Sequence, residues 1–257
     1  MKKLLTPRWL IGHGLVLLAV IVLINLGLWQ LRRLEQRRAL NDSIRAGLAA
    51  PVTVLTGQDV DPAALHRRRV SVTGTFDNPA AIIIRNRPFQ GQPGVHLVTP
   101  LKIKGSERAV LVDRGWIPLD DAEPDKRRVY DMPGEVTING VAYPGQTQPT
   151  GYLIPTDPTL EPGQARLDAW FRLDIDHIQQ QAPYPLLPIY IEQSPQPGAE
   201  LSTPPRPENN TNPALDEGPH LGYALQWFSF ALILVITYGV FVRQELKVRG
   251  HIVTTGQ

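Results

Sequence analysis

Two long apolar segments without formal charge, one near each end of the chain, most constrain what this protein can fold into. The first runs from Trp9 to Leu31 and the second from Leu221 to Val242. A helix of about 20 apolar residues is long enough to cross the hydrocarbon core of a bilayer. Both segments therefore predict transmembrane helices, and the chain is expected to be an integral membrane protein.

The first segment also has features of a cleaved signal peptide, because Lys2, Lys3 and Arg8 precede it. Its apolar stretch is longer than the apolar region of such a peptide. It is followed directly by Arg32 and Arg33, with no small residues that would form a cleavage site. We therefore interpret it as an uncleaved membrane anchor.

The charges around the second segment predict the orientation of the chain. Arg243, Lys247 and Arg249 follow this segment, whereas Asp216 and Glu217 precede it. Basic residues are enriched on the cytoplasmic side of a membrane helix. Both termini are thus expected in the cytoplasm. The lack of an Arg- and Ser-rich presequence favours a bacterial inner membrane over a mitochondrial one.

These signals divide the chain into five parts. The central part is expected outside the cytoplasm, in the periplasm, and it ends in a Pro-rich linker over residues 194–219. The predicted boundaries are a cytoplasmic N-terminus 1–8, a transmembrane helix 9–31, a β-rich domain 32–220, a transmembrane helix 221–242 and a cytoplasmic tail 243–257.

The central part carries the alternating pattern of half-buried strands. Val70, Val72 and Phe76 alternate with polar residues, which predicts one buried and one wet face. The pattern favours an α+β membrane protein in which two transmembrane helices flank an antiparallel β-rich domain, either a sheet or a partly closed barrel. Further strands are expected at 81–85, 95–101, 109–113, 136–141 and 188–192, a basic helix at 31–48 that Pro51 ends, and a short helix at 174–181.

Composition excludes several classes of function. The chain has no cysteine, which removes disulfides, thiolate metal sites and a cysteine nucleophile. Its net charge of +2 is too small to indicate nucleic-acid binding. Recognised catalytic motifs, such as G-x-S-x-G or H-E-x-x-H, are missing from the sequence. An enzyme is therefore not expected.

Two arginine-containing motifs allow more than one interpretation. Arg114 and Gly115 lie in the segment 113–118, which is either a structural corner with the arginine stacked on a ring or a rim that contacts a partner. Arg85 and Arg87 lie beside Phe89, where they either hold an anionic group such as a carboxylate or form a solvated turn.

The histidine that opens the second apolar segment is the main site candidate. His220 follows Pro219 and shares a helical face with Tyr223 and Trp227. An ionisable residue at the end of a membrane helix indicates either a functional site or an interfacial polar residue. Antiparallel helices place Trp29 at a similar depth, whereas His13 lies roughly 25 Å away and cannot bind the same metal.

Four segments of the sequence together resemble a known family. They are LGLWQLRRLEQR, RNRPFQGQPGVHLVTPL, VLVDRGWIP and HLGYALQWF, in this order. From about Leu26 to Phe228 the chain resembles the surfeit locus protein 1 family, whose members are assembly factors for haem–copper cytochrome c oxidase. The resemblance implies a non-catalytic role in placing haem a into the catalytic subunit of the oxidase. It also implies contacts with that subunit, with haem A synthase and with membrane lipid.

The resemblance further implies a haem site at the outer membrane surface. His220 would be an axial ligand of the haem iron, Tyr223 and Trp227 would pack against the macrocycle, and Trp29 would line its opposite side. Two alternatives remain open at this point. One is a scaffold that stabilises the oxidase subunit without binding a cofactor. The other is a membrane-anchored receptor whose β domain binds a small ligand in a large apolar pocket.

Overall fold

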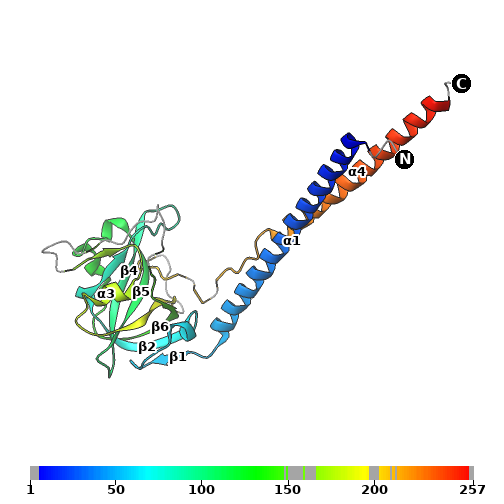
Figure 1. Cartoon of the computed structure of the whole chain (residues 1–257). Coiled ribbons are helices and arrows are strands. Elements are labelled where there is room, and N and C mark those ends of the chain that lie inside the picture. Colours follow the sequence, from blue (N-terminus) through cyan, green and yellow to red (C-terminus); the bar gives the residue numbers. More distant parts are fainter. Residues whose placement is uncertain are drawn as a thin grey trace. The chain divides into compact units, whose positions relative to one another are not determined.

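The computed structural model describes residues 6–147, 149, 159, 166–196, 203–208, 210–211 and 213–254 (Figure 1). It contains two compact units, a helical pair formed by Met1–Ser43 with Leu215–Gln257 and a β-rich domain formed by Ile44–Ala214. The outermost residues of both predicted tails and part of the predicted linker, residues 197–202, 209 and 212, lie outside the described residues.

The helical pair is built from α1 (Pro7–Ala49) and α4 (His220–Thr254). Proline suits the first position of a helix, because the amide hydrogen that it lacks would have no partner there. The helix α1 continues without interruption past Leu31 and stops just before Pro51, as the sequence predicted. Each helix contains a segment long and apolar enough to cross a membrane.

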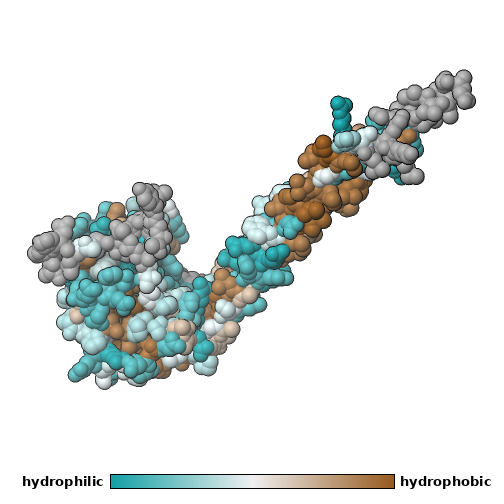
Figure 2. All heavy atoms as spheres, in the orientation of Figure 1, coloured by the Kyte–Doolittle hydropathy of each residue, from teal (hydrophilic) through white to brown (hydrophobic). Residues whose placement is uncertain are grey.

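Small residues line the contact between the two helices. Ala224 and Ala231 of α4 are buried. A Cβ atom added to Gly27 of α1 would lie 2.5 Å from the ring of Phe228. Small side chains let two membrane helices approach closely enough to pack along their backbones. Most large apolar side chains of the pair point outward instead, and Figure 2 shows the resulting hydrophobic surface.

The β-rich domain is a closed barrel, with the strand order β2-β6-β8-β5-β4 and a pairing of β4 back onto β2. Phe76 of β2 pairs with Leu101 of β4 at the point of closure. The strands β1, β3 and β7 extend the same sheet outside the closed ring. The bounds are β1 Thr53–Leu55, β2 Arg69–Phe76, β3 Ile82–Ile84, β4 Gly94–Ile103, β5 Ala109–Pro118, β6 Glu135–Pro144, β7 Ala169–Trp170 and β8 Leu186–Gln193.

The β-rich domain between two helices confirms the predicted fold class, and the pairing adds two details. The strands β2 and β5 belong to one sheet, as expected, but β4 lies between them. Most pairs are antiparallel, whereas β1–β2, β3–β7 and β5–β8 are parallel. The five barrel strands pair in a Greek-key order like that of OB-type barrels.

The barrel core is apolar and formed by the inward residues of its strands. Val70, Val72 and Val112 are completely buried, and Leu101 and Ile189 pack with them. The backbone of β8 passes close to Gly140. A Cβ atom at Gly140 would lie only 2.3 Å from the carbonyl oxygen of Glu192.

The segment 113–118 continues β5 instead of ending a strand at residue 113. The guanidinium of Arg114 lies 4.9 Å from the ring centroid of Phe76 and donates a hydrogen bond to the carbonyl oxygen of Tyr130 at 2.6 Å. Gly115 adopts a φ of +104° and faces the backbone of Arg206. These contacts support the structural interpretation of the motif.

The remaining elements are short helical turns between strands. The predicted helix near residue 174 is α3 (Ile175–Gln179), and the side chain of Asp174 caps it by accepting a hydrogen bond from the His177 amide. The others are α2 Pro62–Leu65, η2 Asn78–Ala80, η3 Leu119–Asp121 and η4 Lys126–Tyr130.

Candidate functional site

His220 is the first residue of α4, and Gln30 of α1 fixes its ring. The Nδ1 atom of His220 lies 2.9 Å from Oε1 of Gln30. An amide oxygen can only accept a hydrogen bond, so Nδ1 carries the proton. The Nε2 atom then keeps its lone pair and is available to a metal ion.

The segment before His220 leaves space beside its ring. Gly218 has a φ of +73°, a conformation that side chains other than glycine rarely adopt. A Cβ atom at Gly218 would lie 3.4 Å from Nε2 and from Cδ2 of His220. The amide of Gly218 donates to the Oδ1 atom of Asp216, at 2.9 Å, which helps to hold the turn. Glycine therefore keeps the metal-binding side of the imidazole open.

Side chains of α1 hold this turn in place. Arg37 and Asn41 both donate to the carbonyl oxygen of Asp216, at 3.1 and 3.3 Å. Arg38 uses two nitrogens, at 2.9 and 3.0 Å, to bind one carboxylate oxygen of Glu217. An exposed ion pair adds little stability. Its effect here is to fix the turn that leads into His220.

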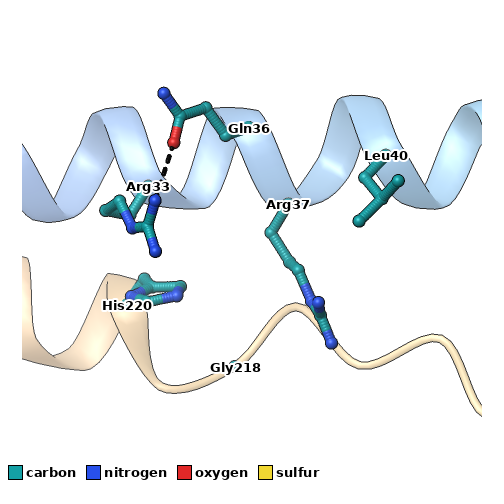
Figure 3. Close-up of a pocket in the computed structure, with 6 residues that line it drawn as sticks. All are labelled: Arg33, Gln36, Arg37, Leu40, Gly218 and His220. Atoms are coloured by element: carbon teal, nitrogen blue, oxygen red, sulfur yellow. Dashed lines mark hydrogen bonds between the residues drawn. The ribbon is translucent and has the colours of Figure 1, made fainter. Parts of the chain in front are cut away.

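A cavity of about 320 Å³ lies next to the imidazole. Figure 3 shows Arg33 and Arg37 reaching from α1 toward the side where His220 lies, and Arg33 donates to Oε1 of Gln36 at 3.2 Å. Guanidinium groups are good partners for carboxylates. The arrangement combines one open imidazole nitrogen with two cations. The lining residues are Arg33, Gln36, Arg37, Leu40, Gly218 and His220.

The aromatic residues predicted at this site occupy different surfaces. Trp29 and Tyr223 have about half of their surface exposed, 51% and 48%. Trp227 packs edge-to-face against Phe230, with ring centroids 6.0 Å apart. In the described part of the chain, no ring contact joins these three residues to His220. Their role as haem neighbours stays a prediction.

The partner of the histidine is Gln30, which the sequence analysis did not single out. Gln30 lies next to Trp29 in sequence but on the side of α1 that meets α4. Whether Trp29 or Gln30 faces His220 depends on how α1 is rotated about its axis relative to α4. The hydrophobic pattern of the sequence did not determine this rotation. The sequence did offer one signal for Gln30, because it is a polar residue inside an apolar segment.

The β domain holds a second polar cluster, which the sequence analysis also did not identify. The Nδ1 atom of His96 on β4 lies 2.9 Å from Oδ2 of Asp113 on β5. Glu192 of β8 is the register partner of Asp113. Glu208 lies 3.8 Å from Nε2 of His96. His96, Asp113, Glu192 and Glu208 are far apart in the sequence. They come together only in the folded domain.

Burial and mutual repulsion shift the titration of this cluster. Burial, followed by the negative charges of Asp113 and Glu208, raises the pKa of Glu192 to about 7. Burial alone would lower the pKa of His96, but the hydrogen bond and charge of Asp113 outweigh it and raise that pKa. Among the described residues no group of three or more His, Asp or Glu has a geometry suited to a metal ion.

Comparison with known proteins finds relatives over almost the whole length of the chain. The sequence profile of the SURF1 family matches residues 17–232. A SURF1-like protein of Monosiga brevicollis is 28% identical over 249 residues, which cover 91% of this chain and 89% of that protein. A SURF1-like protein of Rickettsia felis is 27% identical over 241 residues, with 91% and 97% covered.

A further bacterial relative matches over a similar length. An uncharacterized SURF1-like protein of Mycobacterium bovis is 27% identical over 257 residues, which cover 96% of this chain and 88% of that protein. The profile includes most of α1, the first part of α4, the barrel and the turn that carries His220. The chain belongs to the SURF1 family.

Proposed function

We propose that this protein is an assembly factor for haem–copper cytochrome c oxidase in a bacterial inner membrane. In this role it holds haem a for insertion into the catalytic subunit of the oxidase. One observation carries the proposal: the open Nε2 atom of His220 lies beside a cavity lined by two guanidinium groups. The proposal assigns no catalytic step to the protein.

The residues of the cavity fit the chemistry of a haem. A neutral imidazole nitrogen is a common axial ligand of haem iron. Arg33 and Arg37 suit the two propionate carboxylates at the edge of the macrocycle. The volume of about 320 Å³ is at the lower end for ligand sites, so the cavity would hold only part of a haem, through His220, Arg33 and Arg37. The bound haem supplies the redox centre that the oxidase needs.

The arrangement also suits a cargo that has to be released. His220 offers one ligand to the iron, and the other groups at the cavity are side chains at a helix surface. With one ligating side chain, His220, and two exposed arginines, the cavity would hold a haem less firmly than an enclosed pocket with two ligating side chains. Haem A synthase is the proposed donor, and the catalytic subunit of the oxidase is the proposed acceptor.

The proposed orientation has both termini in the cytoplasm. Arg243 and Lys247 at the end of α4 support it, because positive charge is retained on the cytoplasmic side. A reporter fused after Gln257 should then be active only if it works in the cytoplasm. A reporter inserted near Asn210 should be active only if it works outside, and the reverse pattern would refute the orientation.

Removal of His220 tests the haem site. The protein is purified from cells that make haem a, and its absorption spectrum is recorded together with that of the His220→Ala variant. We expect the variant to be inserted and stable, because its side chain lies at a helix end, but to lose bound haem. His13→Ala is the matched control, because His13 bonds to Tyr238 at the other end of the helical pair.

The outcomes separate haem binding from scaffolding. Equal haem content and an identical Soret band in the parent and in His220→Ala would show that His220 is not the ligand. A parent protein without haem, still associated with the oxidase subunit, would favour the scaffold. If aromatic packing alone retains the macrocycle in His220→Ala, the haem remains but its Soret band shifts, because the iron has changed its ligand.

A further inference from the structure

The β domain carries a second cleft that the proposed haem site does not use. It has a volume of about 660 Å³ and opens between the β3–β4 connection and η3. Its size is within the range of ligand-binding sites. The residues that line it are Ile83, Arg85, Asn86, Arg87, Pro88, Pro93, Gly94, Val95, Leu119, Ala122 and Glu123.

The connection that forms one side of the cleft is held in a fixed shape. Phe89 and Gln92 exchange two backbone hydrogen bonds, at 2.9 and 3.0 Å. The ring of Phe89 lies 5.6 Å from that of Trp116, and the guanidinium of Arg206 covers both rings. Asn86 adopts a φ of +59°, which is uncommon outside glycine. A loop that is already ordered loses little entropy when it binds a partner.

Two guanidinium groups of this loop are available at the cleft. Arg85 lies 5.8 Å over the ring of Phe171, a contact that orients it without neutralising it. Across the residues that the structure describes, neither Arg85 nor Arg87 forms a hydrogen bond or ion pair through its side chain. Glu123 is the only carboxylate among the lining residues. The cleft therefore carries a net positive charge.

Apolar groups adjoin these cations. Leu119 of η3 is 52% exposed, and Ile83 and Val95 form the buried wall behind it. Exposed leucine beside unpaired arginine favours a ligand that offers both a carboxylate and an apolar group. The cleft is open along the surface, so it suits a chain that passes through it better than a small molecule, most of whose surface would be enclosed.

We infer that this cleft binds an acidic peptide segment of a partner protein. Arg85 and Arg87 pair with carboxylate side chains of the segment, and Leu119 contacts an apolar side chain two positions further along the same face of the segment. The two arginines are two positions apart in sequence. Alternate residues of an extended peptide lie roughly 6.6 Å apart on one face, which lets two acidic residues meet two neighbouring arginines. The inference does not depend on haem binding at His220.

A defined peptide tests the inference on the full-length protein. The protein is placed in nanodiscs of zwitterionic phosphatidylcholine, and binding of rhodamine-labelled Gly-Ser-Glu-Ser-Glu-Ser-Leu-Gly, which presents both Glu residues and the Leu on one face, is followed by fluorescence anisotropy. We expect the double variant Arg85→Gln/Arg87→Gln to bind at least about tenfold more weakly, because each lost charge-assisted pair removes affinity. The variant Arg85→Lys/Arg87→Lys should retain part of the binding, because it keeps charge without the bidentate geometry.

Two controls isolate the cleft and the charge. Lys104→Gln/Lys126→Gln removes the same charge from exposed residues that do not line the cleft, and it should bind like the parent. The peptide with Gln in place of both Glu residues should not bind. Thermal unfolding of each variant establishes that the barrel remains folded.

Three results would overturn the assignment. Equal binding by the parent and by Arg85→Gln/Arg87→Gln would exclude the arginines as the site. Displacement of the peptide by an equal concentration of free glutamate would identify a site for small carboxylates. Binding of phosphatidylglycerol vesicles that is stronger for the parent than for Arg85→Gln/Arg87→Gln, with no binding of the peptide to either protein, would identify a membrane surface as the occupant.

Discussion

The helical pair and the barrel use the same apolar residue types in opposite ways. Val70 and Val72 of the barrel are completely buried, whereas Leu15 and Leu225 of the helices are 62% and 61% exposed. Burial of apolar surface away from water stabilises a barrel in water. Helices that expose apolar side chains require an apolar surrounding, which a bilayer supplies. The contrast shows that each region is adapted to a different solvent.

Polar groups differ between the two regions as well. The β-rich domain pairs its buried Arg127 with the partly exposed Asp168. The helical pair keeps two bonded polar pairs near its ends, His13 with Tyr238 and His220 with Gln30. In both regions a polar group withdrawn from water requires a partner. The second of these pairs holds the histidine that we propose as the haem ligand.

The largest effect is expected from a charge placed in the barrel core. The variant Val72→Asp puts an unpaired carboxylate into a completely buried position. It should cost about 4 kcal/mol or more and unfold the domain. Limited proteolysis of the membrane-inserted protein measures the loss. Thr75→Asp is the control on the same strand, since Thr75 is exposed, and equal protease sensitivity of the two variants would contradict the barrel interior.

A methyl group added at a tightly packed glycine should destabilise the barrel more than the helical pair. Gly140→Ala meets a backbone oxygen that cannot move away, and we expect a loss of about 3 kcal/mol. Gly27→Ala meets the ring of Phe228, which can rotate, so a loss of about 1 kcal/mol is expected.

Thermal unfolding of the three variants in one detergent ranks these effects. Gly14→Ala is the control, because a Cβ atom there meets nothing within 4 Å. It should match the parent or exceed it slightly, as alanine favours helix. A larger loss of stability for Gly27→Ala than for Gly140→Ala would contradict the expectation that the barrel is packed more rigidly than the helical pair.

Local sequence patterns predicted most helices and strands of the fold but not which strands pair with one another. The alternation of Val70, Val72 and Phe76 identified a strand because period two is a local property. Closure of β4 onto β2 and the parallel pairing of β5 with β8 depend on contacts far apart in sequence. The predicted strand at 109–113 was too short. Arg114 and Gly115 were interpreted as the corner that ends the strand, whereas β5 continues through them.

The site was predictable to a similar extent. His220 was singled out because it opens an apolar segment, which is visible in sequence. Gln30 was not, because the choice between it and Trp29 depends on how α1 is rotated against α4. The pairing of His96 with Asp113 requires the strand register, which shifts between His96 and Val98. Such relations are set by tertiary packing.

A smaller effect is expected from the pH dependence of the barrel. The pKa of Glu192 is raised to about 7, so the folded state holds a proton that the unfolded state has released. Stability from this group is complete below the ordinary pKa and falls as the pH rises toward 7. Between pH 5.5 and pH 8 the loss should be about 2 kcal/mol.

The variant Glu192→Gln should remove most of this pH dependence and stabilise the domain at pH 8. The amide oxygen of Gln can still accept the hydrogen bond of Tyr143. Urea unfolding at pH 5.5 and pH 8, followed by proteolysis, measures both proteins. A remaining slope just above pH 6.5 is expected from His96, whose raised pKa also makes stability fall as the pH rises. An unchanged slope in Glu192→Gln would exclude Glu192 as its source.

The smallest expected effect comes from Gln30, and it tests whether the helical pair orients its histidine. Gln30 accepts the hydrogen bond of Nδ1 and thereby leaves Nε2 open toward the cavity. Removing a partner of this kind typically weakens a metal site by tenfold or more. We expect Gln30→Leu to bind haem about tenfold more weakly than the parent, while Gln30→Glu, which also accepts from Nδ1, retains binding.

Haem titration of the protein in nanodiscs, with the Soret band as readout, separates a positioning role from a structural one. Loss of orientation should leave the ligand in place but allow the ring to turn, so Gln30→Leu should show lower affinity with an unchanged Soret position at saturation. Gln36→Leu is the matched control, because Gln36 lines the same cavity and bonds to Arg33 instead of to the imidazole. If both leucine variants weaken haem binding equally, the effect arises from the polarity of the cavity, and Gln30 does not position the histidine.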